Sequence, residues 1–288
     1  MDVIALSKIR DIKSVWSSIP TIEGAGVRLR RAFGFHQVPH LDPFLLLDHF
    51  GSENPDDYIL GFPWHPHRGI ETITYMLSGH VKHGDSLGNG GMIGPGDVQW
   101  MTAGSGIIHE EMPQRTEGTL MGFQLWANLP ASQKMMHPRY RDVNASDIIQ
   151  VKLENDVEVK IVAGKVGENI GPVTDVVTNP EYLDVFIPSG AAFTHPVVAG
   201  HTVFAYVYHG NGKFSPSSKS IQSAENIVLY DDGGSVSIEA KSDLRFLLVS
   251  GKPLNEPVAW RGPIVMNTDE ELRIAFAEYR DGTFLKHK

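Results

Sequence analysis

Two pairs of potential metal ligands, each with one residue between its members, constrain this chain more than any other feature. His65 and His67 form the first pair, and His109 and Glu111 form the second. In an extended strand successive side chains alternate between two faces, so the members of each pair point the same way. If the two strands face each other, three imidazoles and one carboxylate converge on a point, which predicts a metal site.

The residue types indicate which metal chemistry such a site would support. Neutral imidazole suits iron, copper, nickel and zinc, and a carboxylate adds a harder, negatively charged ligand. Four protein ligands leave one or two positions open on a five- or six-coordinate metal, whereas a closed tetrahedral zinc site would be structural. The alternative is that a pair is accidental, because the chain has 13 histidines and histidine is often partly buried.

The segments around these pairs are short, rich in β-branched and aromatic residues, and separated by glycine and proline. Examples are residues 42–50, 71–77, 98–102 and 123–128. Many short strands with Gly/Pro turns and no long helical period predict an all-β sandwich or barrel. A small barrel can hold a ligand site in its mouth, which suits inward-facing histidine and glutamate side chains.

The beginning of the chain is also typical of β-structure. Residues 3–35 predict a β-hairpin that is broken at Gly24–Gly26. Arg28, Arg30 and Arg31 follow the break, and an anion-binding surface is one interpretation of them. We favour the other interpretation, in which this strand has one solvated face that carries the arginines.

The strand pattern restarts after a linker at residues 130–142, which predicts an internal repeat. Aligning Gly79 with Gly210, and Gly104 with Gly233, superimposes strand-like segments of the two halves. The four ligand positions of the first half then fall on residues that do not bind metals: Pro196, Val198, Ile238 and Ala240.

The repeat predicts two domains of the same fold. We expect a metal-binding barrel at residues 1–135 and a second barrel without a metal site at residues 143–288. The histidines of the second half, His195, His201 and His209, are expected at the surface or in strand turns.

Composition limits the classes of function. The 288 residues carry 34 acidic and 25 basic side chains, and this net charge of −9 argues against broad nucleic-acid binding. The absence of cysteine excludes a disulfide framework, an iron–sulfur cluster and a cysteine nucleophile. No apolar run approaches membrane-spanning length, and residues 1–8 lack the apolar core of a signal peptide, so we expect a cytoplasmic protein without membrane contact.

One helix is predicted near the end of the chain. Thr268 and Glu271 have the spacing of a capping box, and residues 272–279 follow as an amphipathic helix that ends near Gly282. The apolar face of this helix is expected to pack on a barrel.

Taken together, these segments resemble the pirin family of the cupin superfamily. The spacing of His65, His67, Glu71 and Gly79 resembles the first cupin motif, and residues 104–109 resemble a variant of the second. More specific matches to pirins are residues 41–48, 62–69, 99–104, 109–113, 124–126 and 262–268. The resemblance extends from near residue 28 to the end of the chain.

The resemblance implies a bicupin, with two tandem jelly-roll β-barrels and a C-terminal helix. It implies that the N-terminal barrel holds one divalent transition metal, usually Fe(II), with Mn, Ni, Cu and Zn as alternatives. The implied ligands are the four that strand parity also selects: His65, His67, His109 and Glu111. Glu71, a ligand in other cupins, is not a ligand in pirins and is expected to support the site. The implied lining of the substrate cavity is Asp48, Phe62, Arg68 and Gln124.

The resemblance also implies quercetin 2,3-dioxygenase activity, with a flavonol and dioxygen as substrates. Glu111 would be the general base that accepts the proton of the flavonol hydroxyl. Arg68 would pair with anionic oxygens of the substrate, or would instead form a salt bridge that holds its strand. The alternative function is a non-catalytic, iron-dependent, redox-sensing regulator that binds a transcription factor or a metabolic enzyme.

Overall fold

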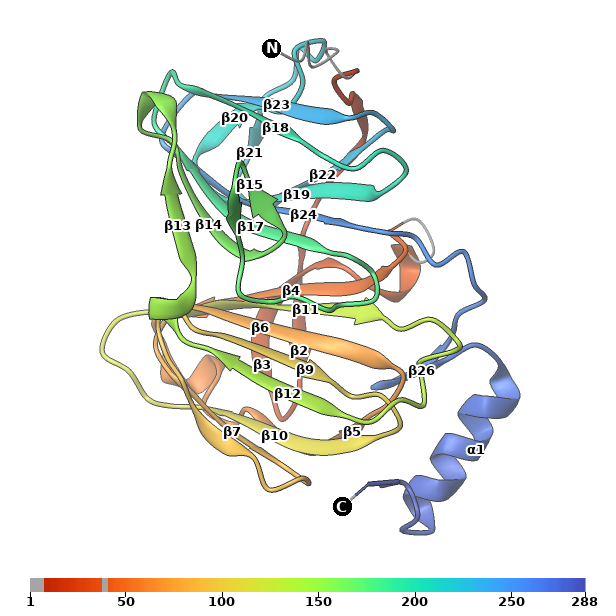
Figure 1. Ribbon diagram of the computed structural model, residues 1–288. Helices are drawn as coiled ribbons and strands as arrows, with labels where there is room; N and C mark the ends of the chain where they lie inside the picture. The colour runs from red at the N-terminus through yellow and green to blue at the C-terminus, as the bar shows by residue number, and fades with distance from the viewer. Residues whose placement is uncertain (1–7, 38–40, 288) are drawn as a thin grey trace. The chain divides into compact units, whose positions relative to one another are not determined.

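The computed structural model describes residues 8–37 and 41–287, and almost all of its regular structure is β-strand (Figure 1). The described chain forms two compact units. Residues 19–37, 41–145 and 254–287 make up one unit, called here the first barrel, and residues 8–18 and 146–253 make up the second barrel. The N-terminal segment therefore belongs to the second barrel, and the C-terminal segment belongs to the first barrel. This division differs from the contiguous one at residues 135–143.

The first barrel has a seven-stranded and a four-stranded antiparallel sheet. The larger sheet has the order β12-β9-β6-β11-β4-β3-β2, and the smaller has the order β5-β10-β7-β8. The strands of the first barrel are β2(Ile19–Glu23), β3(Val27–Phe33), β4(Phe44–Ser52), β5(Phe62–His67), β6(Ile70–Ser78), β7(Val81–Asp85), β8(Gly90–Ile93), β9(Val98–Thr102), β10(Ile107–Pro113), β11(Leu120–Asn128), β12(Arg139–Val143), β25(Ala259–Arg261) and β26(Ile264–Met266).

The second barrel repeats this arrangement strand by strand. Its larger sheet has the order β1-β22-β19-β24-β17-β14-β13, and its smaller sheet has the order β18-β23-β20-β21. The strands of the second barrel are β1(Ile12–Ser17), β13(Ile149–Lys152), β14(Glu158–Ala163), β15(Lys165–Val166), β16(Asn169–Ile170), β17(Glu181–Ile187), β18(Ala192–Pro196), β19(Thr202–His209), β20(Asn211–Lys213), β21(Gln222–Ser223), β22(Asn226–Tyr230), β23(Ser235–Ala240) and β24(Leu244–Gly251). The predicted internal repeat and the all-β, two-barrel fold are confirmed.

The predicted hairpin at residues 3–35 is only partly correct. β2 and β3 do pair across Gly24–Gly26. Residues 12–17, however, pair as β1 with β22 and belong to the second barrel. Residues 3–7 lie outside the described part of the chain. Alternation of apolar and polar residues predicts a strand but does not identify its partner, which tertiary packing selects.

Helix α1(Asp269–Arg280) begins with the predicted capping box, in which Thr268 and Glu271 each accept a backbone N–H of the other. Leu272 and Ala275 of this helix are buried in a cluster with Ile264 of β26. α1 therefore packs on the first barrel beside β26, as Figure 1 shows. Among the described residues, no helix is long and apolar enough to cross a membrane.

A glycine allows the C-terminal segment to approach the strand that carries two of the predicted ligands. Gly69 has a φ of +79°, and a Cβ atom there would lie 2.0 Å from the carbonyl oxygen of Val265. Only glycine combines this backbone conformation with such close contact. The backbone N–H of Val265 donates to the carbonyl of Arg68 at 3.1 Å, which joins β26 to the end of β5.

Candidate metal centre

Adjacent strands β5 and β10 bring three histidines together in the first barrel. His65 lies directly opposite His109, and His67 lies opposite Ile107. Because residues two apart share a face, the three imidazoles lie on the same side of the sheet. One ligand nitrogen from each of His65, His67 and His109 lies within 4.8 Å of the other two.

Two of these imidazoles present unprotonated nitrogens to each other. His65 Nδ1 lies 2.9 Å from the carbonyl oxygen of Pro63, and His67 Nδ1 lies 3.0 Å from that of Pro263. A carbonyl only accepts, so each Nδ1 carries a proton, and in the neutral form of each ring Nε2 then carries a lone pair. The two Nε2 atoms are 3.1 Å apart. Facing lone pairs repel unless a cation lies between them, so this geometry fits a bound metal.

The third imidazole, that of His109, is fully buried, and neither of its ring nitrogens has a hydrogen-bond partner. Burial holds the pKa values of His67 and His109 well below the usual range, and the neighbouring histidines lower them further. Both rings are therefore neutral at physiological pH and able to donate an electron pair to a metal. Three neutral imidazoles suit a divalent first-row transition metal.

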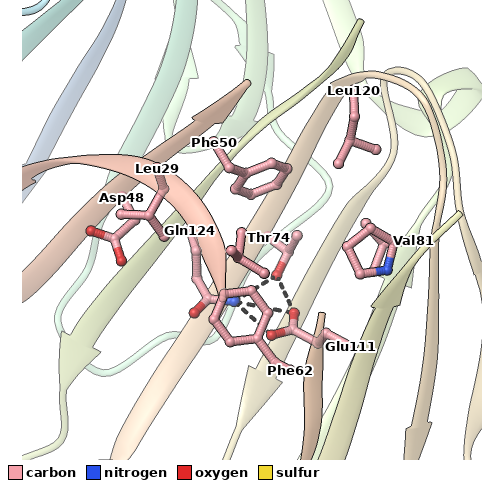
Figure 2. Close-up of a pocket in the computed structure, with 11 residues that line it drawn as sticks. Leu29, Asp48, Phe50, Phe62, Thr74, Val81, Glu111, Leu120 and Gln124 are labelled. Carbon is pink, nitrogen blue, oxygen red and sulfur yellow. Dashed lines mark hydrogen bonds between the residues drawn. The ribbon is translucent and has the colours of Figure 1, made fainter. Parts of the chain in front are cut away.

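Glu111 lies two residues beyond His109 on β10, but its carboxylate is not part of the group of ligand atoms within 4.8 Å of one another. Thr74 donates to Glu111 Oε1 at 3.0 Å, and Gln124 donates to Oε2 at 2.8 Å. Figure 2 shows both side chains reaching the carboxylate. Trp126 Nε1 in turn donates to the Gln124 carbonyl oxygen at 3.1 Å, which fixes the orientation of the amide. The carboxylate is thus held by Thr74 and Gln124, on the same face of β10 as His109.

A cavity of about 640 Å³ opens onto His65 and His67. Its volume is in the range of sites that bind small organic molecules. Among the residues that the sequence associates with substrate binding, Asp48, Phe62 and Gln124 line this cavity. Its wall also contains three aromatic residues that sequence reasoning missed, Phe35, Trp126 and Trp260.

Arg68 does not line this cavity. Its side chain is only 2% exposed and donates to the carbonyl oxygens of Ser105 and Phe284, both at 2.7 Å. The guanidinium also forms an ion pair with Glu278 of α1 at 2.8 Å. This geometry corresponds to the expected alternative, a salt bridge that holds the strand.

Arg31 is the arginine that lines the cavity, so the expectation of a fully solvated arginine face was wrong at this position. Arg31 forms two hydrogen bonds to the Asp48 carboxylate, at 2.9 and 2.7 Å, and an ion pair with Glu23 at 2.7 Å. Burial raises the pKa of Asp48 to about 6, although Arg31 opposes this shift. The wall of the cavity is therefore polar and charged on this side.

Two buried polar residues complete the surroundings. Glu71 accepts a 2.6 Å hydrogen bond from Thr102, and burial raises the pKa of this carboxyl group. His83, which sequence reasoning missed, lies opposite Glu111 on β7, and its ring centroid is 5.3 Å from that of His109. Neither buried ring nitrogen of His83 has a hydrogen-bond partner among the described residues, although Nε2 lies 3.8 Å from Asp85 Oδ2. The alternation of β7 puts this imidazole inside the barrel, next to His109.

The second barrel has a histidine at only one of the four corresponding positions. Its strands β18 and β23 pair Phe193 with Ile238 and His195 with Val236, as β5 and β10 pair His65 with His109 and His67 with Ile107. The counterparts of His65 and His67 are therefore Phe193 and His195, and the predicted alignment with Pro196 and Val198 was wrong. In the described part of the chain, no further group of three ligand atoms resembles the histidine site.

The fold and this site define a two-barrel cupin with a histidine-rich site in one barrel that fits a cupin metal site. Family models of pirin and of the pirin C-terminal cupin domain match residues 26–127 and 182–285. A Pseudomonas aeruginosa protein named "Putative quercetin 2,3-dioxygenase" is 42% identical over 96% of this chain and 99% of its own length. Human pirin is 40% identical over 90% of this chain and 88% of its own length. The chain belongs to the pirin family.

A solved structure supports the same assignment. The crystal structure of a quercetin 2,3-dioxygenase from Acinetobacter baumannii superimposes with a TM-score of 0.89 at 32% identity. The superposition covers 96% of this chain and 99% of that protein.

Proposed function

We propose that the first barrel is a dioxygenase that uses one divalent transition metal, most favourably Fe(II), to cleave a flavonol such as quercetin. His65, His67, His109 and Glu111 would hold the metal. The observation that carries this proposal is the 3.1 Å separation of two unprotonated Nε2 atoms at the wall of a ligand-sized cavity. A structural zinc site is closed by four protein ligands and does not need a cavity beside it.

The cavity wall supports a flat aromatic substrate. Phe35 contacts Trp260 at a centroid distance of 5.6 Å, and Trp260 contacts Trp126 at 6.0 Å. Trp126 in turn lies against the His67 ring at 5.0 Å. Aromatic side chains bind planar rings through stacked and edge contacts, so this continuous wall would orient a polyphenol beside the histidines.

A bound metal would supply Lewis acidity toward a phenolic hydroxyl and redox capacity toward dioxygen. The protein residues would position and deprotonate the substrate. Glu111 would accept the hydroxyl proton, because its carboxylate lies on the same face of β10 as His109. Gln124 and Thr74 would keep the carboxylate oriented during this transfer through the hydrogen bonds described above. The aromatic wall would exclude bulk water from the reacting groups.

The names of the relatives agree with this proposal, since quercetin 2,3-dioxygenases are among the proteins similar to this chain along nearly its whole length. The test is oxygen uptake with quercetin by metal-free protein reconstituted anaerobically with Fe(II), Mn(II), Ni(II), Cu(II) or Zn(II). We expect metal-selective uptake that Glu111→Gln abolishes. Glu110→Gln is the matched control, because this neighbour points to the opposite face of β10.

Absence of uptake with every metal, in protein shown to bind each metal, would overturn the dioxygenase proposal. An activity that survives Glu111→Gln would instead remove the general-base role from Glu111. A partner affinity that changes with the oxidation state of iron, without turnover of any flavonol, would favour the regulator over the enzyme.

A further inference from the structure

The second barrel has a cavity of about 620 Å³, nearly as large as the cavity at the metal centre. Glu181 of β17, Ser250 of β24 and Pro196 of β18 line it, together with residues of the connections that follow β14 and β18. The counterparts of β17, β24, β14 and β18 in the first barrel, β4, β11, β3 and β5, line the cavity beside the histidines. The two cavities therefore occupy corresponding ends of the two barrels.

A metal ion is not the occupant that this second cavity fits. Three of the four ligand positions are apolar and buried in the second barrel, namely Phe193, Ile238 and Ala240. The fourth position is His195, and its Nε2 lies 2.9 Å from the carboxylate of Glu181. The expectation of a surface or turn position was wrong for His195, which lies within β18 and is 2% exposed. His201 lies in the turn between β18 and β19, as expected, although it is only 8% exposed.

The Glu181 carboxylate on the cavity wall can receive a hydrogen-bond donor. Its side chain is 14% exposed, and among the described residues His195 occupies one of its oxygens. His201 also lines the cavity, but its Nδ1 is buried and does not open onto the cavity. Burial and the nearby Arg10 hold the pKa of His201 below the usual range, so the ring is neutral and adds no positive charge to the wall.

The charge around the cavity favours a cation. Glu181 and Asp175 are the acidic residues of the lining, and Lys165 is its lysine. Arg10 does not line the cavity, and its guanidinium donates to the carbonyl oxygens of Val198, His201, Asp231 and Gly233. It also forms an ion pair with Asp232 at 3.5 Å. The rest of the wall is largely apolar and includes Val173, Val176 and Val197.

We propose that this cavity is a second, metal-independent binding site for a small organic cation, an amine or amidine on an apolar body. The ammonium or amidinium group donates to the Glu181 carboxylate, and the apolar body packs on the valines. Hydrogen bonds to a charged group are stronger than neutral ones, so Glu181 contributes most of the preference for a cation.

The test compares three probes with the same ring and different head groups: benzylamine, benzyl alcohol and benzoate. Each is titrated into the full-length, Zn(II)-loaded, isotope-labelled protein while amide chemical shifts are recorded. Zn(II) is diamagnetic and occupies the first barrel, so the resonances separate binding at the two cavities. We expect benzylamine to shift the amides of Val173, Val197 and His201, and benzyl alcohol and benzoate to bind more weakly.

Glu181→Gln keeps a hydrogen-bonding group beside His195 and removes the charge, and we expect it to weaken benzylamine binding by about tenfold. Glu154→Gln, an exposed position in the same barrel, is the control and should leave the affinity unchanged. The proposal is overturned if benzylamine shifts no amide of the cavity, if benzoate binds there equally well, or if Glu181→Gln leaves the affinity unaltered. None of these outcomes depends on dioxygenase activity in the first barrel.

Discussion

The Nε2 atoms of His65 and His67 lie 3.1 Å apart, and each ring carries its proton on the opposite nitrogen. Backbone carbonyls of Pro63 and Pro263 impose these tautomers. The two imidazoles are therefore prepared to donate to one cation before any cation is bound, which lowers the reorganisation needed for metal binding.

This arrangement predicts a large stabilisation by metal. At a free metal concentration 100 times Kd, binding adds about 2.7 kcal/mol to the free energy of unfolding, and the melting temperature rises accordingly. His65→Ala should abolish most of this increase. His80→Ala, an exposed histidine outside the group, should retain it. Thermal melts with and without Zn(II) measure both, and an equal increase in wild type and His65→Ala would contradict the assignment of His65 as a ligand.

His83 should contribute to metal affinity without being a ligand. Its ring stacks on Tyr140 at a centroid distance of 5.1 Å and lies beside His109, whose nitrogens have no protein partner. Groups that support ligand imidazoles typically change metal affinity 10- to 100-fold, so we expect His83→Phe to raise the Kd about tenfold. Competition with a chromophoric chelator measures the Kd. An unchanged value would show that His83 only fills space.

Arg68 should determine stability and not substrate affinity. Arg68→Met removes an ion pair with Glu278, which keeps Lys286 as a partner, and it leaves two buried carbonyl oxygens without their donor. We expect a loss of about 2–5 kcal/mol in the free energy of unfolding, measured by urea denaturation. Arg273→Met, which breaks the exposed pair with Glu270, should cost less than about 1 kcal/mol. A stable Arg68→Met protein with a raised KM would instead assign Arg68 to the substrate.

His49 should make the metal-free protein less stable in acid. Burial and the nearby Arg30 lower the pKa of His49 to about 4. The unfolded chain has the ordinary histidine pKa and therefore binds more protons between about pH 6.5 and pH 4, so the contribution of His49 to stability is lost as the pH falls through this range.

The contribution amounts to at most about 1.4 kcal/mol per pH unit. His49→Gln should show a correspondingly smaller decrease in the free energy of unfolding between pH 6.5 and pH 4. Denaturation curves of both proteins at several pH values measure this effect. Subtracting one protein from the other cancels the contribution of the other histidines, which both proteins share. Parallel curves for the two proteins would contradict the prediction.

The parts of the site that depend on strand parity were accessible from the sequence. His65 and His67 are two residues apart on β5, and His109 lies near the start of β10, shortly after Gly106. Strand alternation from these positions is enough to put the three side chains on a common face. Glu111 shares that face, but its carboxylate accepts hydrogen bonds from Gln124 and Thr74. The spacing of residues in a strand does not predict such hydrogen-bond partners.

Other features required the tertiary structure. Alternation puts Arg31 on the same face of β3 as Leu29, but only the pairing of β3 with β4 shows that Arg31 lies opposite Asp48 at the cavity. The repeat alignment missed the counterparts of the ligands because the connection from β18 to β19 is longer than that from β5 to β6. Matching glycines after the strands therefore displaced Pro196 onto the position that Phe193 occupies in the observed register.

The contribution of the C-terminal segment to the first barrel has a consequence for biosynthesis. Pro263 sets the tautomer of His67. Phe284 accepts a hydrogen bond from Arg68, the residue after His67 in the chain. A nascent chain whose first half alone has left the ribosome contains all the proposed ligands. It lacks the C-terminal segment with Pro263, which orients His67. Mature metal affinity is therefore acquired only when translation is almost finished, after the intervening second barrel has been synthesised.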